Sequence, residues 1–342
     1  MSLLTAERLV KLAYKYPNLS NTWYLIATAC LTVINQPDEI PKLYHFALRQ
    51  QLLEDAPTTG NPSLLTNKYL LQLAHDSIES AKRYQDLTAV GMNLPDILIP
   101  PGYYDKLPLS YKFNKGEDIF KHQDQLTARF REVILKSAGL IGLPKVINAS
   151  LVLKTVTPTN FRSGAVPMRP CMVTPGHIPS ASILSEDVNG TRFDDPSKGG
   201  NLTVDTIDGP ISPLSINNHQ IFKDLKRGSD FGMSVYRDDV NTRIKNPMLA
   251  AYPDLWYYAY HHVYAPLLSD TDIIGAKDTS LCIIACLLPQ DVNPQLEGHL
   301  KGAVHNGASK EEIEDTRQLL FDICEWKGGI TWKGGKESVA KL

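Results

Sequence analysis

The chain has 342 residues, of which 43% are hydrophobic and 21% are charged, as in a globular protein with a substantial core. Its 35 lysines and arginines nearly balance its 37 aspartates and glutamates. This balance excludes the strongly basic surface of a nucleic-acid-binding protein and the polybasic face of a protein that binds anionic membranes. The longest purely apolar run, Leu281 to Leu288, is far shorter than the ~20 residues of a membrane helix, so we expect no membrane insertion.

Helical patterns dominate residues 1–155, which we take as an N-terminal helical unit. Thr5 is placed as the N-cap of a first helix, and residues 21–33 and 41–53 carry apolar side chains at helical spacing. A further helical pattern begins near Leu126, with Phe130 on its apolar face.

Residues 156–220 have a different composition and predict an irregular arm. Eight prolines and six glycines fall between residues 157 and 213, so no long helix can persist there. One short hairpin is expected near Thr203–Ile211. Two arginines of the arm, Arg162 and Arg169, could bind an anionic substrate or be ordinary solvated side chains.

Residues 221–330 form a second helical unit. Residues 252–264 are unusually aromatic, which is more typical of packing or of an oligomer interface than of a ligand site. Residues 281–288 predict a fully buried helix, and a helix over 296–306 should end at Gly307. Ser309 and Glu312 then have the spacing of a capping box. No strand-rich block competes, so the predicted fold is all-α.

The cysteines and the last three residues indicate the cellular compartment in which the protein resides. Five cysteines without clustered spacing favour a reducing environment over a disulfide framework. The final residues Ala340-Lys341-Leu342 are a conservative variant of the Ser-Lys-Leu peroxisomal signal, which predicts the peroxisomal matrix and an import receptor as partner. The glycine-rich run 328–335 predicts that residues 331–342 form a flexible tail.

One helix carries His299, Ala303 and Gly307 at intervals of four residues, and the next helix opens with Glu312-Ile313. This arrangement resembles the carboxymuconolactone decarboxylase family, which shares its fold with the AhpD-like alkylhydroperoxidases. The resemblance covers about residues 255–327 and extends to fungal peroxisomal members. It implies an AhpD-like helical bundle.

Residues 130–149 resemble the closing helix pair of the same family, with Gly142 and Pro144 at the turn between the helices. Residues 22–31 and 43–48 would be the earlier helices of this copy. The resemblance therefore implies two degenerate repeats, joined by the arm, that could pair as a pseudo-dimer. Because family protomers oligomerise, it also implies a homo-oligomer.

The family's site residues are only partly present. Peroxidatic members carry Cys-x-x-Cys three residues before the histidine, and Val292 and Gln295 occupy those positions here, which argues against a thiol peroxidase. Ser280 stands where the family commonly has a catalytic Glu, and a hydroxyl cannot accept a proton near neutral pH as a carboxylate does. His299 remains as the candidate catalytic residue, a general acid or base that could protonate a carbanion or enolate after loss of carbon dioxide. The alternative is a histidine retained for helix packing.

Two functions remain open on this basis. The first is cofactor-free acid–base chemistry on a small organic acid, either decarboxylation or conversion of a lactone or keto acid. The second is a non-catalytic AhpD-fold assembly or binding protein that has lost the family site. No cofactor fingerprint is present, and the adjacent His261 and His262 cannot share one helix face, so we expect neither a cofactor nor a metal. Cys282 and Cys286, four residues apart on an apolar helix, are expected to be core residues rather than a redox pair.

Overall fold

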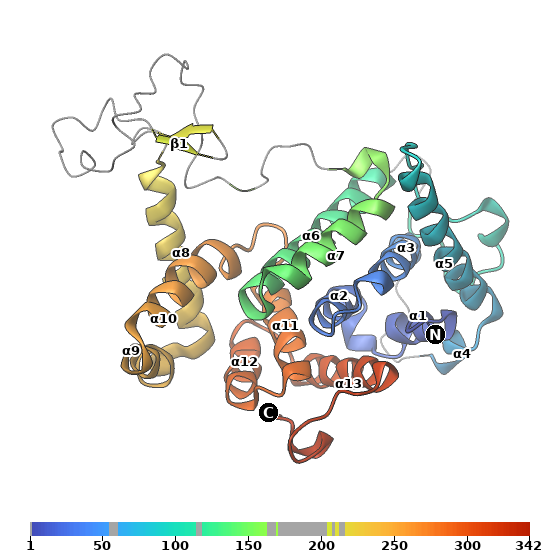
Figure 1. Cartoon of the computed structure of the whole chain (residues 1–342). Coiled ribbons are helices and arrows are strands. Elements are labelled where there is room, and N and C mark those ends of the chain that lie inside the picture. Colours follow the sequence, from blue (N-terminus) through green and yellow to red (C-terminus); the bar gives the residue numbers. More distant parts are fainter. Residues whose placement is uncertain are drawn as a thin grey trace.

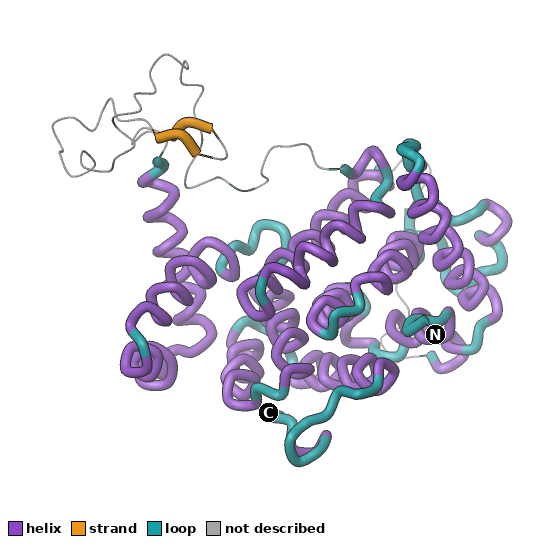
Figure 2. Tube along the Cα trace, in the orientation of Figure 1, coloured by secondary structure: helices purple, strands orange, loops and turns teal. Residues whose placement is uncertain are grey.

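The computed structural model describes residues 2–54, 61–113, 118–162, 169, 204–206, 209–211 and 216–342. These ranges are mostly helical, which confirms the predicted all-α class (Figure 1, Figure 2). None of the described helices combines the length and apolar character needed to cross a lipid bilayer.

The N-terminal half follows the predicted pattern and adds one long helix, α5, that the sequence did not indicate. Thr5 caps α1 by accepting a hydrogen bond from the Arg8 N–H. Gly142, at φ +83°, separates α6 from α7 at the predicted turn. The α-helices are α1 (Ala6–Tyr14), α2 (Trp23–Val33), α3 (Ile40–Gln50), α4 (Pro62–Leu65), α5 (Lys68–Ala89), α6 (Ile119–Ile141) and α7 (Leu143–Val156), with short 3₁₀ turns η1 (Pro17–Leu19), η2 (Pro37–Glu39), η3 (Pro101–Tyr103) and η4 (Thr159–Phe161).

The predicted hairpin is present as β1 (Val204–Thr206) and β2 (Gly209–Ile211), which pair antiparallel with Val204 opposite Ile211. Most of the remaining residues predicted as the irregular arm lie outside the described ranges.

The C-terminal half contains the predicted buried helix and the predicted caps. Gly307 adopts φ +93°, and the Ala308 N–H bonds to the carbonyl of Ala303, which closes the preceding helix. Ser309 and Glu312 form the capping box. The elements are α8 (Asn218–Tyr236), η8 (Arg237–Asp239), π-helix η9 (Val240–Lys245), α9 (Asn246–Ala251), α10 (Pro253–Tyr258), π-helix η10 (Ala259–Leu268), α11 (Ala276–Leu287), η11 (Leu288–Gln290), α12 (Asn293–His305), α13 (Lys310–Lys327) and η12 (Lys336–Ser338).

Two buried helices, α2 and α11, lie at the centre of the molecule. Every residue of α2 is buried, as are residues 279–287 of α11. The two helices pack against each other and both contact α6 and α13, so the halves share one hydrophobic core (Figure 1).

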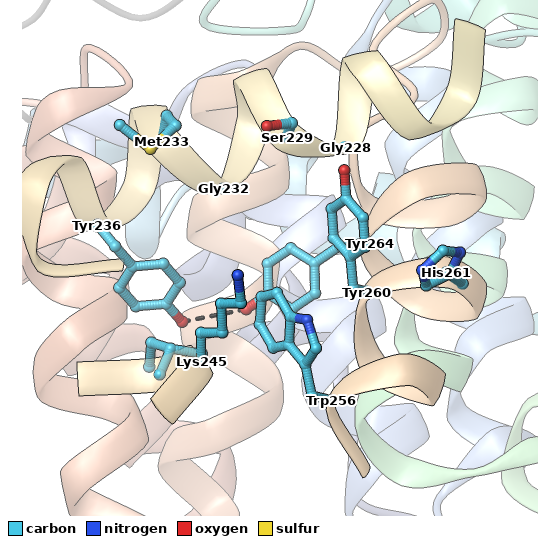
Figure 3. A pocket seen from close by; sticks show the side chains of 11 residues that line it. Gly228, Ser229, Gly232, Met233, Tyr236, Lys245, Trp256, Tyr260, His261 and Tyr264 are labelled. Atoms are coloured by element: carbon cyan, nitrogen blue, oxygen red, sulfur yellow. Dashed lines mark hydrogen bonds between the residues drawn. The ribbon is translucent and has the colours of Figure 1, made fainter. Parts of the chain in front are cut away.

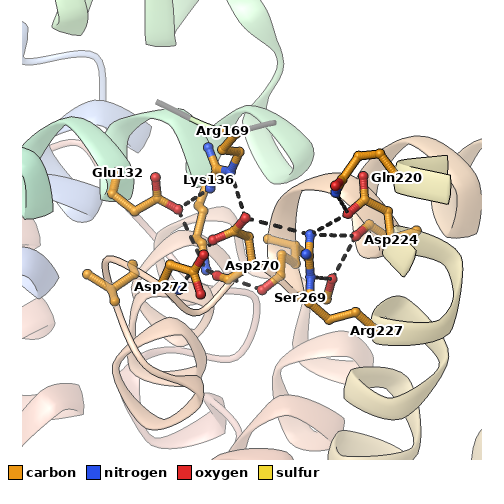
Figure 4. A network of polar contacts seen from close by, with 12 residues as sticks. Glu132, Lys136, Arg169, Gln220, Asp224, Arg227, Ser269, Asp270 and Asp272 are labelled. Carbon is orange, nitrogen blue, oxygen red and sulfur yellow. Dashed lines mark hydrogen bonds and ion pairs between the residues drawn. The ribbon is translucent and has the colours of Figure 1, made fainter. Parts of the chain in front are cut away.

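A network of buried ion pairs joins α6 to the loop after η10 (Figure 4). Arg169 pairs with Glu132 of α6, and its Nε lies 3.2 Å from Asp270 Oδ2. Lys136 donates to Thr279 Oγ1 at 2.8 Å and to the carbonyl of Leu268 at 3.2 Å. Burial lowers the pKa of Lys136 to about 8 and raises that of Glu132.

The same network continues into α8. Arg227 lies 2.9 Å from Asp224 and 3.6 Å from Asp270, and its Nε donates to Ser269 Oγ (Figure 4). Arg169 is therefore engaged by two carboxylates, which supports a structural role for it rather than the binding of an anionic substrate.

Two glycines allow α8 to approach its neighbours closely. A Cβ on Gly302 of α12 would lie 2.5 Å from Val235 Cγ1 of α8. A Cβ on Gly228 of α8 would lie 2.5 Å from the Ala265 Cα of η10. Helix α8 therefore lies between α12 and η10 at distances that side chains at these positions would prevent.

Gly302→Ala should lower the free energy of unfolding by about 1–3 kcal/mol, because the added methyl group overpacks the contact with Val235. Urea unfolding followed by circular dichroism measures this. Gly232→Ala is the matched control, because nothing lies within 4 Å of its Cβ position, and it should be neutral or stabilise by up to about 1 kcal/mol. Equal stability of Gly302→Ala and the unsubstituted protein would contradict the close approach.

Candidate functional site

The candidate catalytic residue, His299, lies on α12 and is only 5% exposed. Its Nε2 is 2.9 Å from the hydroxyl of Tyr236, the last residue of α8. The Tyr236 hydroxyl is in turn 3.0 Å from the hydroxyl of Tyr264 on η10 (Figure 3). Three groups from three helices thus form one hydrogen-bonded chain, which we call the His–Tyr–Tyr chain.

The position of α8 brings this chain together. Val235, which precedes Tyr236, occupies the space that Gly302 leaves open. The Tyr236 ring lies against α12, with its Cε1 3.4 Å from the Cβ position of Gly298. The rings of Tyr236 and His299 meet at a steep angle, with centroids 5.6 Å apart.

All three groups are neutral at neutral pH. Burial lowers the pKa of His299 to about 4 and raises the pKa values of Tyr236 and Tyr264 further above neutral. A hydroxyl both donates and accepts, and either nitrogen of a neutral imidazole can carry the proton. The hydrogen bonds of the His–Tyr–Tyr chain can therefore point in either direction, and the Tyr264 hydroxyl at its far end can either donate or accept.

A pocket of about 360 Å³ lies against the His–Tyr–Tyr chain, between α8, η9, α10 and η10 (Figure 3). Trp256 and Tyr260 stack in parallel along it, and the Tyr260 hydroxyl is fixed by the carbonyl of Leu225 at 2.7 Å. The pocket is lined by Gly228, Ser229, Gly232, Met233, Tyr236, Ile244, Lys245, Trp256, Tyr260, His261 and Tyr264.

Lys245 supplies the positive charge of the pocket. The described lining residues include no carboxylate. The pocket therefore favours a small ligand that carries a negative charge.

Ser280 is not part of the His–Tyr–Tyr chain. Its hydroxyl donates to the carbonyl of Ala276 and accepts from the Asn306 side chain, both at 2.9 Å. In the described structure, Tyr236 is the side-chain partner of His299.

The other candidate residues are buried or make contacts within the folded protein. Cys282 and Cys286 are buried, and burial raises the pKa of both thiols, that of Cys286 to about 12, so neither is a thiolate at neutral pH. His305 is exposed and bonds to the carbonyl of Val235 at 3.0 Å. His261 stacks on Tyr257 rather than joining a metal site, and among the described residues no cluster of three or more histidine, cysteine or acidic side chains is arranged to hold a metal ion.

A second buried histidine, His45 on α3, shows by contrast what a structural histidine looks like in this fold. Its Nδ1 lies 3.0 Å from Ser80 Oγ and its Nε2 lies 3.0 Å from the carbonyl of Val156. Both ring nitrogens of His45 are thus engaged by the protein. In the described structure, His299 has a partner at Nε2 only, and that partner lines the pocket.

Sequence reasoning missed Tyr236 and Lys245. Neither lies in a recognisable motif, and the pocket forms only where α8 and η9 meet the aromatic segment 252–264. That segment was interpreted as packing, whereas Trp256, Tyr260 and Tyr264 also line the pocket.

The fold and the site define a helical protein with a buried His–Tyr–Tyr chain beside an aromatic pocket. No family model matches the chain, and no solved structure matches it. The chain is 36% identical over 337 residues to peroxisomal protein 2 of Saccharomyces cerevisiae, which covers 97% of this chain and 98% of that protein. It is also 28% identical over 211 residues to peroxisomal protein 2 of Schizosaccharomyces pombe, which covers 62% of this chain and 75% of that protein.

The chain therefore belongs to the peroxisomal protein 2 family of fungi. It is a peroxisomal protein, which confirms the predicted localisation.

Acidification should destabilise the fold through His299. Its folded pKa of about 4 lies below 6.5, the ordinary pKa of a histidine, so the unfolded chain takes up a proton between these pH values while the folded chain does not. The contribution of His299 to the free energy of unfolding is fully present above pH 6.5. It falls by about 3 kcal/mol as the pH is lowered to 4. Urea unfolding of the unsubstituted protein and of His299→Gln is measured between these pH values. The difference between the two pH dependences isolates the contribution of His299, because His45 is present in both proteins.

The His305→Gln variant is the matched control on the same helix and should keep the full pH dependence. An identical pH dependence in His299→Gln and the unsubstituted protein would show that His299 is not a buried neutral histidine.

Proposed function

We propose that this peroxisomal protein has a carboxymuconolactone decarboxylase-like fold and performs cofactor-free acid–base chemistry on a small organic acid in the aromatic pocket. One observation carries the proposal: Tyr236 both lines the pocket and bonds to His299 at 2.9 Å. The histidine on which the family resemblance rests is thereby connected to a space that a ligand can enter.

The residues have distinct roles in this proposal. Lys245 binds the acid group of the ligand, and the stacked rings of Trp256 and Tyr260 exclude water from the rest of it. The Tyr264 hydroxyl donates a hydrogen bond to the enolate oxygen that develops in the reaction, and His299 holds this hydroxyl in place through Tyr236.

The reaction that fits these groups best is a decarboxylation. The bond from the ligand carbon to its carboxylate breaks, carbon dioxide leaves, and the electron pair stays on the ligand as an enolate. A proton delivered along the His–Tyr–Tyr chain then forms the new C–H bond, and solvent restores that proton to the chain. The net change is the loss of carbon dioxide and the gain of one proton.

A specific observation favours the non-catalytic alternative. Ser280 replaces the family carboxylate and is bonded to Asn306, and in the described structure His299 has no acidic partner to raise its basicity. In that case the same pocket binds a small organic acid and releases it unchanged.

Metabolite consumption separates the two functions. The unsubstituted protein, Tyr236→Phe, His299→Gln and the control His305→Gln are each incubated with an extract of peroxisomal small molecules and analysed by mass spectrometry. An enzyme should convert one acid to a product lighter by carbon dioxide, and the first two variants should slow this by about 10²–10⁴-fold while His305→Gln does not.

If the unsubstituted protein retains an acid through gel filtration without converting it, the chain is the binding protein. Equal conversion by all four proteins would show that the His–Tyr–Tyr chain is not the site.

We also propose that a peroxisomal import receptor binds Ala340-Lys341-Leu342, which membership in a peroxisomal family supports. The two repeats and the homo-oligomer stay predictions. An exposed apolar stripe on α7, formed by Leu143, Ile147 and Leu151, supports the homo-oligomer.

A further inference from the structure

The C-terminal tail lies against the body of the protein at its targeting residues. Val339 is only 2% exposed. The Ala340 N–H donates to Asn293 Oδ1 at 2.8 Å. Arg317 of α13 donates from Nε to the Ala340 carbonyl at 3.1 Å and from Nη2 to the Val339 carbonyl at 3.3 Å. We call Arg317 and Asn293 the tail clamp.

The preceding residues bring the tail to this position. The Trp332 ring packs edge-on against Phe321, with centroids 5.2 Å apart, and its Nε1 donates to the carbonyl of Leu288 at 2.9 Å. The Lys333 N–H donates to Asp291 Oδ2 at 2.7 Å. Figure 1 shows the chain turning back from α13 toward α12.

The glycines that predict a flexible tail serve here to turn the chain. Gly328, Gly329, Gly334 and Gly335 all adopt positive φ, between +67° and +85°, which other residues rarely do. The run therefore makes two sharp bends that return the chain to the body.

The clamp holds the backbone groups that a receptor would need. An extended peptide is recognised largely through its main-chain N–H and carbonyl groups, and both of those groups of Ala340 are already engaged. Lys341 and the side chain of Leu342 are exposed, so the tripeptide is partly presented and partly held.

We propose that Arg317 and Asn293 withhold the targeting tripeptide, so that the import receptor binds only chains whose tail has left the body. This inference rests on the proposed targeting role of residues 340–342. The receptor's apparent affinity is then reduced by the fraction of chains with a free tail. Weakening the clamp should increase receptor binding without any change in the tripeptide itself.

The test measures binding of the full chain to the tripeptide-binding domain of a peroxisomal import receptor, by isothermal titration calorimetry. Asn293→Ala and Arg317→Leu should each bind about tenfold more tightly than the unsubstituted protein. A free peptide of residues 333–342 should bind at least as tightly as either variant. Lys301→Gln is the control, because its exposed pair with Glu297 on α12 lies outside the clamp.

Two results would overturn the inference in different ways. If the unsubstituted protein binds as tightly as the peptide and both clamp variants, the tail is not withheld, although the targeting role stands. If neither the peptide nor any full chain binds, or if deleting residues 340–342 leaves binding unchanged, the targeting role fails and the inference fails with it. Asn293→Ala keeps the test valid if Arg317→Leu, a change at a buried side chain, does not fold.

Discussion

The close packing of α8 between α12 and η10 is the constraint on which the site depends. It requires that Gly302 and Gly228 carry no side chain, because a Cβ at either position would lie 2.5 Å from an atom of the neighbouring helix. Only at this separation does Tyr236 reach His299 on one side and Tyr264 on the other. Gly228 and Tyr236 of α8 also line the aromatic pocket (Figure 3).

The other end of α8 is held by the buried ion network. Arg227 and Asp224 of α8 are linked through Asp270 to Arg169, and Arg169 is linked to Glu132 of α6 (Figure 4). Removing one member would leave a partner charge buried and unpaired, which is strongly unfavourable. The candidate site in the C-terminal half is thus fixed by contacts to the N-terminal half, as expected for two halves that share one core.

Local rules predicted the parts of the fold that local chemistry determines. The Thr5 cap, the Ser309 capping box and the helix end at Gly307 each follow from a few neighbouring residues. The pocket follows from no such rule, because its lining residues, between 228 and 264, meet only after α8, η9, α10 and η10 have packed. The glycine-rich tail shows the same limit, since composition alone does not give the φ angles that return the chain to Arg317.

The central claim is that His299 is a neutral, buried histidine bonded to Tyr236. Nitrogen-15 NMR of histidine side chains, titrated across the pH range from 7 to about 4, tests it most directly, with His299→Gln used for assignment. The account predicts that the His299 ring stays neutral until the pH approaches about 4, and that Tyr236→Phe shifts its Nε2 resonance. A His299 ring that titrates near 6.5, the ordinary pKa of a histidine, and does not respond to Tyr236→Phe would contradict the account.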